Sequence, residues 1–253
     1  MNHGSFLFQN RFIRIKSKNK GVIKISTNKI FICGDCHGDI DFHKLNTKNF
    51  LQGTQLTKQD YVIVCGDFGA VWDGAKSDKY LQKWYNEKPW TTLFIDGNHE
   101  NHVLLDSYPI SEWNGGKVHF ITPSIIHLMR GQVYKIGNKN FFTMGGAESH
   151  DKIYRKEGIS WWPREMPSDD EYEEGLANLN KVNNQVDYII SHCAPDQLQS
   201  QIAYWYEHNK LTNYLEIMRQ TVEFKDWFLG HYHIDKDFGK YHILYQNIVE
   251  LGD

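Results

Sequence analysis

Three short apolar runs, each ending in a glycine and a polar residue, stand out along the first hundred residues. They cover 29–35 (KIFICGD), 61–67 (YVIVCGD) and 91–98 (TTLFIDGN). Fully apolar runs of this length are typical of buried strands, and amphipathic stretches over roughly 40–50 and 76–87 predict helices between them. The alternation favours parallel strands joined by right-handed crossovers.

The pattern changes after residue 115. Short strand-like segments follow closely as KVHFI, SIIHLM, QVYKI and KNFFTMGG, and this spacing predicts antiparallel hairpins. Further on we expect a helix from Ser168, a strand over 186–192, a helix over 196–221, a strand over 226–233 and a closing strand pair within 240–251. Since no linker is visible, residues 1–253 are predicted to form a single α/β domain with a mixed sheet system.

Two segments fall outside this pattern. Residues 1–29 carry seven Lys or Arg and no acidic residue. Because the formal net charge of the whole chain is −3, residues 30–253 carry a net charge of −10. Residues 1–28 are predicted to form a basic hairpin extension, and contact with nucleic acid or another polyanion is the alternative. Residues 147–170 are irregular and hold two tryptophans and two prolines, so we expect a cap-like insertion there.

Composition narrows the class of protein. Hydrophobic residues make up 40% of the chain and charged residues 23%, which excludes a disordered or fibrous protein. No apolar run approaches the ~20 residues of a membrane span, and the N-terminus lacks a secretory pattern. A cytoplasmic protein with reduced cysteines is expected. Cys33 and Cys36 form a lone CxxC without a second pair, so a buried strand end is favoured over a redox or zinc site.

Five polar clusters follow the apolar runs. They are Gly34-Asp35-Cys36-His37-Gly38, Gly66-Asp67, Gly97-Asn98-His99-Glu100, Ser191-His192 and Gly230-His231-Tyr232-His233. In open α/β sheets, sites gather beyond the carboxyl ends of the strands, so the clusters can converge. Asp, Asn and His suit Mn, Fe, Zn or Mg. The set is large enough for two ions sharing a carboxylate, an arrangement suited to displacement at phosphorus.

The order GDxH, GD, GNHE, H and GHxH resembles the calcineurin-like metallophosphoesterases from Asp35 to His233. The resemblance implies a four-layer αββα sandwich of two mixed sheets. It also implies two divalent ions, with manganese the first expectation and Fe, Zn, Ni or Mg the alternatives. One would be held by Asp35, His37, Asp67 and His233, and the other by Asp67, Asn98, His192 and His231. Asp67 would bridge them, and His99 would face the leaving group.

The expected activity is hydrolysis of phosphate mono- or diesters by a metal-activated hydroxide. A nucleotide or nucleic acid is the favoured substrate, and the sequence predicts no oligomeric state. Ala70 and Val71 stand where the protein Ser/Thr phosphatase branch has Asp and Arg, which counts against phosphoprotein phosphatase activity. That activity is kept as a second hypothesis, because GNHE resembles the same branch. Asp73 or Glu100 could then orient His99. A non-catalytic interaction scaffold is the third hypothesis, although every ligand position is filled.

Substrate contacts are expected from the cap-like insertion. Arg155 and Arg164 could meet phosphate, because guanidinium groups pair with its oxygens. Trp161 or Trp162 could stack on a base. The alternative is that the tryptophans hold the cap together and the arginines lie in solvent.

Overall fold

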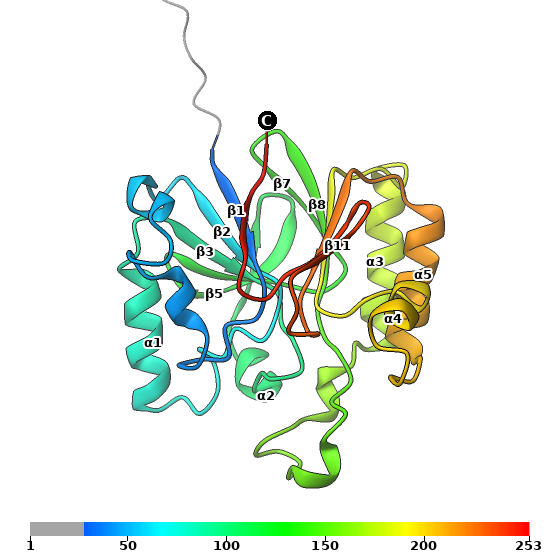
Figure 1. Ribbon diagram of the computed structural model, residues 1–253, viewed down its shortest axis with the longest axis horizontal. Coiled ribbons are helices and arrows are strands. Elements are labelled where there is room, and N and C mark those ends of the chain that lie inside the picture. The colour runs from blue at the N-terminus through cyan, green and yellow to red at the C-terminus, as the bar shows by residue number, and fades with distance from the viewer. Residues whose placement is uncertain (1–27, 253) are drawn as a thin grey trace, which may run out of the picture.

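The computed structural model describes residues 28–252, which form two mixed sheets with helices on their outer faces (Figure 1). The seven-stranded sheet has the order β13-β1-β2-β3-β6-β5-β4, and the six-stranded sheet has the order β11-β12-β10-β9-β8-β7. Helix α1 (Lys76–Asn86) covers the first sheet, and helices α3 (Asp169–Lys181), α4 (Asp196–Ile202) and α5 (Lys210–Thr221) cover the second. The four-layer αββα sandwich implied by the resemblance is confirmed.

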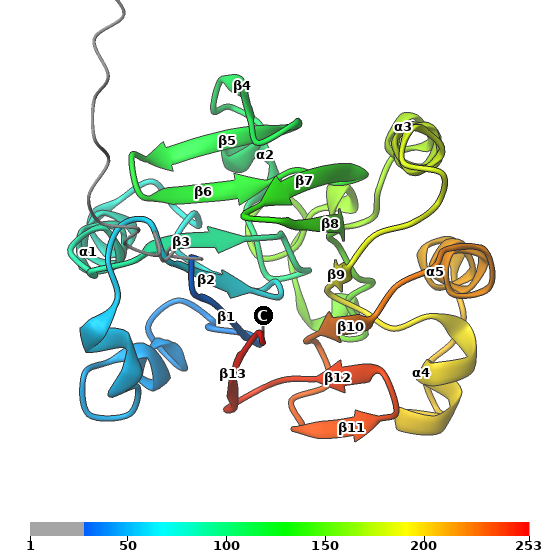
Figure 2. The same cartoon turned by 90° about the horizontal axis from the view of Figure 1, so that it is seen from above.

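The strands of the first sheet are β1 (Ile30–Cys33), β2 (Tyr61–Val64), β3 (Thr91–Phe94), β4 (Ile110–Trp113), β5 (Gly116–Thr122), β6 (Ile125–Leu128) and β13 (Ile248–Glu250). Those of the second are β7 (Gln132–Ile136), β8 (Lys139–Met144), β9 (Tyr188–Ser191), β10 (Asp226–Leu229), β11 (Lys236–Phe238) and β12 (Tyr241–Ile243). Figure 2 shows the two sheets side by side, with β13 next to β1 and β12 next to β10.

The uninterrupted apolar runs are explained by burial of both strand faces. In β1, Ile30 and Ile32 face the core between the sheets, whereas Phe31 and Cys33 pack in the core beneath α1. Side chains alternate along a strand, so a strand covered on both faces needs apolar residues at every position. Cys33 is buried at the end of β1, as predicted, and the four cysteines are all free.

The predicted parallel strands are confirmed. β1 pairs with β2 and β2 with β3 in parallel, and β9 lies parallel between β8 and β10. Their carboxyl ends therefore meet at one edge of the sandwich. The hairpins β5–β6 and β7–β8 are antiparallel, as expected. Ser168 is the N-cap of helix α3 and forms a capping box with Glu171, and three acidic residues lie in the first turn.

Three element predictions are wrong. Residues 40–50 form a single 3-10 turn, η1 (Phe42–Leu45), followed by η2 (Gln52–Gln55), because Asn46 Oδ1 accepts from the backbone of Lys48 and Asn49 and ends the turn. The helix expected over 196–221 is split in two, since Asn209 caps a new helix at Lys210. The closing strands do not pair together, because β12 joins β10 and β13 joins β1.

Short elements also occur where the pattern gave no prediction. They are β4, β11, helix α2 (His102–Leu105), η3 (Lys152–Tyr154) and η4 (Pro163–Glu165). The predicted basic hairpin lies outside the described residues. None of the helices described is both long enough and apolar enough to cross a membrane.

Candidate metal centre

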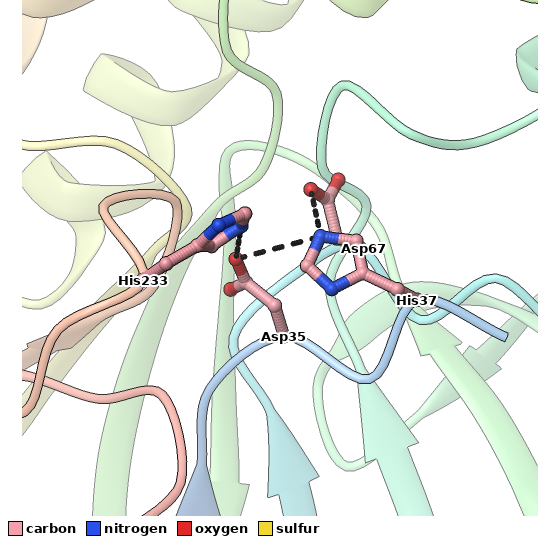
Figure 3. Close-up of side chains that lie close together, drawn as sticks. All are labelled: Asp35, His37, Asp67 and His233. Carbon is pink, nitrogen blue, oxygen red and sulfur yellow. Dashed lines mark ion pairs between the residues drawn. The ribbon is translucent and has the colours of Figure 1, made fainter. Parts of the chain in front are cut away.

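Four side chains from the loops that follow β1, β2 and β10 lie within reach of a single ion (Figure 3). One ligand atom from each of Asp35, His37, Asp67 and His233 lies within 4.8 Å of the others. His37 Nε2 is 3.3 Å from Asp67 Oδ2, and His233 Nε2 is 3.2 Å from Asp35 Oδ2. The structure thus brings together the residues expected for the first ion.

Three further candidates lie on the other side of Asp67. His192 Nε2 is 3.4 Å from Asp67 Oδ1 and 3.2 Å from Asn98 Oδ1. The rings of His192 and His231 are 5.0 Å apart. Asp67 therefore presents Oδ2 to His37 in the first group and Oδ1 to His192 in the second, as a carboxylate shared by two ions would.

Hydrogen bonds fix which nitrogen of two histidines faces the centre. His37 Nδ1 lies 2.7 Å from Asp41 Oδ2, and His192 Nδ1 lies 2.7 Å from the Cys65 carbonyl. Such partners hold Nδ1 protonated and leave Nε2 for a metal. The nitrogen and oxygen donors gathered here fit divalent ions such as Mn, Fe or Zn.

The electrostatics of the cluster favour a cation. Burial works to lower the pKa of His37, but Asp67, Asp35 and Asp41 outweigh it and raise this pKa to about 9. Burial also works to lower the pKa of His192, but Asp67 and Asp35 outweigh it and raise this pKa to about 10. The pKa of Asp67 lies well below its usual value, because His192 and His37 outweigh the effect of burial. Protons on these rings balance the buried carboxylates, and bound cations would replace them.

The glycines of the motifs make room for side chains of neighbouring motifs. A β-carbon at Gly97 would clash with the Asp67 carboxylate, one at Gly66 with the His192 ring, and one at Gly230 with the Asp35 carboxylate. These three glycine pairs therefore serve two motifs, because each glycine lets a candidate ligand from another strand pack against the backbone.

Four of the candidate ligands have left-handed backbone conformations. Among the seven non-glycine residues of 28–252 with positive φ, four are His37 (φ 43°), Asp67 (46°), His231 (69°) and His233 (51°), and the others are asparagines. Positive φ is costly for residues with a β-carbon and concentrates at functional sites. The turns after β1, β2 and β10 thus carry strain that aims these side chains inward.

His99 lies at the rim of the cluster. Its backbone N–H donates to Asp67 Oδ1 at 2.7 Å, and Arg155 Nη2 is 2.9 Å from its Nε2. Burial lowers the pKa of His99, and Arg155 adds to this effect while Asp67 opposes it. Neither carboxylate considered for orienting its ring contacts it. Glu100 accepts from the backbone of Phe68, and Asp73 accepts from Ala75 and Ser77.

The other candidate substrate residues of segment 147–170 are placed differently. Trp162 is 4% exposed and meets Trp72 edge-on at 5.3 Å, so its ring is held in packing. Trp161 lies under the Lys152 amine, which is 5.2 Å from its ring. Arg164 pairs with Glu171 and Asp106 and does not reach the cluster. Of these candidates, Arg155 alone is in contact with a residue of the centre.

Sequence inspection missed two buried residues that hold Asn98. Its Nδ2 donates to Ser149 Oγ at 3.1 Å, and Ser149 Oγ donates to Glu165 Oε2 at 2.7 Å. Glu165 is fully buried and also receives the Ser149 N–H and the Lys152 amine. This series of hydrogen bonds keeps Asn98 Oδ1 turned toward His192. No motif marked either residue, because both lie in the irregular segment 147–170.

The fold and the cluster together place a candidate metal site at the carboxyl edge of two sheets. The model of the calcineurin-like phosphoesterase family matches residues 28–235. The chain belongs to this family, as the sequence motifs indicated.

The chain is also similar to curated proteins. Lariat debranching enzyme A of Xenopus laevis is 29% identical over 218 residues, which are 77% of this chain and 38% of the relative. The lariat debranching enzymes of Gallus gallus (26%; 77% and 37%) and Schizosaccharomyces pombe (24%; 78% and 42%) follow. The chain thus spans less than half the length of these relatives. A solved structure, the sulfate thiohydrolase SoxB of Thermus thermophilus, is 11% identical over 87% of this chain and 51% of that chain, with a TM-score of 0.40.

Proposed function

We propose that this protein is a metal-dependent phosphodiesterase that acts on a nucleic acid or nucleotide. The observation that carries the proposal is the position of Asp67, whose two carboxylate oxygens face two separate groups of candidate ligands. Membership of the phosphoesterase family supports the hydrolase class. The names of the curated relatives, lariat debranching enzymes, support a phosphodiester as the bond that is cut.

Each candidate ligand has a proposed place. Asp35, His37, Asp67 and His233 would hold one divalent ion, and Asp67, Asn98, His192 and His231 would hold the second. Two such ions neutralise the charge of a phosphate and lower the pKa of a bound water toward about 7. The chain itself supplies the rigid turns and the hydrogen bonds from Asp41 and Cys65 that keep the ligands oriented. Manganese is the proposed metal.

His99 and Arg155 are proposed to act on the phosphate and the departing group. Arg155 is a fixed positive charge on the cap, and its hydrogen bond to His99 places both at one side of the cluster. Arg155 would pair with a phosphate oxygen in place of the arginine that Val71 replaces. His99 would then be free to stabilise the departing oxygen. This assignment gives the cap a role in binding rather than in shielding alone.

The two alternative functions, a phosphoprotein phosphatase and a non-catalytic scaffold, differ from the proposed one in substrate and in metal binding. A phosphoprotein phosphatase would cut phosphoserine peptides, whereas a scaffold would bind metal weakly or not at all. The cytoplasmic location stays a prediction.

The test is a screen of the manganese-loaded protein. The substrates are bis-p-nitrophenyl phosphate, a 2′–5′ and a 3′–5′ dinucleotide, a nucleoside monophosphate and a phosphoserine peptide. Diester hydrolysis that is abolished by EDTA and by Asp35→Asn supports the proposal. Hydrolysis of the phosphopeptide without hydrolysis of any diester would refute it. So would a metal-loaded protein inactive on every ester.

A further inference from the structure

A cavity of about 490 Å³ opens beside the candidate metal centre and shares His37, His99 and His233 with it. Its size lies within the range of about 300–1,000 Å³ common for small-molecule sites. A phosphate bound by the ions that Asp35, Asp67 and their neighbours would hold would therefore have its attached organic group next to this cavity.

The walls of the cavity are largely apolar. Ile40 is 72% exposed, although it is a large aliphatic side chain next to the most polar part of the molecule. Trp72 and Leu81 line the same space. Trp72 is half-buried, and the edge-on contact with Trp162 fixes the orientation of its ring. An exposed isoleucine and an immobilised indole suit a flat ring, because aromatic faces stack on bases whatever the sequence.

The charges of the lining disfavour a second phosphate. No Lys or Arg among the described residues lines the cavity, which instead contains three aspartates. The Asp78 carboxylate accepts hydrogen bonds from the backbone N–H groups of residues 72–74. The Asp41 carboxylate is hydrogen-bonded to His37 and Tyr245. Asp39 is exposed and makes no side-chain hydrogen bond or ion pair with residues 28–252. It is thus available to an N–H donor.

We infer that this cavity binds a nucleobase of the phosphoester substrate. An uncharged flat ring with amino or imino N–H groups matches the apolar walls, the indole face and the free carboxylate. Trp72 and Ile40 are the residues that would set this preference. The inference rests on the proposed function and deepens it, since it places one base of the substrate beside His99.

The experiment compares dinucleotides that differ by one base. Adenylyl-adenosine and its two abasic analogues, lacking the first or the second adenine, are offered to the manganese-loaded protein. One stacked base is worth about tenfold in binding. We therefore expect kcat/KM to fall about tenfold for one of the two abasic analogues, through KM. Trp72→Ala and Ile40→Ala should reduce the ratio of kcat/KM for adenylyl-adenosine to kcat/KM for that abasic analogue toward one.

Ile110→Ala is the matched control, because Ile110 is similarly exposed (62%) but lies on β4 at the far edge of the first sheet. Equal rates on all three dinucleotides in the wild-type protein would overturn the inference and leave the proposed function intact. Preference for a phosphotyrosine peptide over the dinucleotides would also overturn it.

Binding without catalysis separates the two proposals. Equilibrium dialysis of adenosine against the wild-type protein should show binding that Trp72→Ala weakens about tenfold. If no ester is cut, the proposed function fails, yet adenosine binding of this kind would still support the cavity assignment. Absence of adenosine binding to the folded, metal-loaded protein would refute it.

Discussion

At the scale of single residues, three glycines of the motifs are important because they lack a β-carbon and so leave space for the side chains of candidate ligands. Gly97 packs against the Asp67 carboxylate, so Gly97→Ala should push that side chain away from both ligand groups. We expect the variant to fold and to bind less metal. Gly252→Ala, where a methyl group meets nothing within 4 Å, is the control. Full metal content in Gly97→Ala, measured by elemental analysis, would show that the space is not needed.

Ser149 is expected to act through Asn98. Ser149→Ala removes the acceptor of the Asn98 amide hydrogens and frees that amide to rotate. Loss of such an orienting partner typically costs about 10–100-fold in metal affinity. Ser149→Thr should keep most of the affinity. Ser124→Ala, at an equally buried serine that binds Asn86, should keep it fully. Titration with manganese measures the dissociation constant of the wild-type protein and of each variant. An unchanged dissociation constant in Ser149→Ala would show that Ser149 does not orient Asn98.

His99 is expected to act on the leaving group rather than on the metals. His99→Asn should keep both ions and lose about 10²–10⁴ in rate on nucleoside esters, whose leaving oxygen needs stabilisation. The loss should be smaller on p-nitrophenyl esters, since nitrophenolate leaves without help. Equal losses on both substrates in a metal-replete variant would assign His99 a structural role.

At the scale of elements, a second buried polar cluster joins β3, β5 and β6 to α2. Asp96 accepts from Arg130 and lies near His127 and His102, and His119 contacts His127. Burial lowers the pKa of His102 to about 3 and that of His119 to about 4. Between about pH 6.5 and pH 4, the unfolded chain binds protons at His102 and His119, whereas the folded chain does not.

This cluster should make the protein acid-labile. Because the unfolded state holds more protons below pH 6.5, the free energy of unfolding should fall as the pH drops from about 6.5 to about 4. Urea unfolding of the EDTA-treated protein at each pH measures it. His102→Gln, which cannot ionise, should flatten this slope, and His208→Gln, at an exposed histidine, should not. The same slope in His102→Gln as in the wild type would exclude His102 as a cause.

The elements show how far the sequence could predict the structure. Apolar runs of strand length, each closing on glycine and a polar residue, sufficed to locate β1, β2 and β3. The split at Asn209 and the 3-10 turns near Asn46 depend on side-chain to backbone bonds that periodicity does not register. The burial of Trp162 and the place of Glu165 depend on long-range packing. Partners so far apart along the chain, such as Asn98 and Ser149, leave no local pattern.

At the scale of the whole molecule, two sheets bring five distant motifs to one edge. The site draws on both sheets, since Asp35, Asp67 and Asn98 follow strands of the first and His192 follows a strand of the second. The apolar core between the sheets, with Ile32 and Ile190 in it, therefore also sets the separation of the ligand groups. The single-domain assignment and the role of the basic first 28 residues stay predictions.

The central claim is that Asp67 joins two metal ions, and metal stoichiometry tests it most directly. Elemental analysis of the manganese-loaded wild-type protein after gel filtration should give two ions per chain. Asp67→Asn should lose both to a large extent, and Asp35→Asn should lose mainly one. Asp73→Asn, at a carboxylate that accepts from the Ala75 N–H just before α1, should keep two. An Asp67→Asn protein that is folded and still carries two ions per chain would contradict the account.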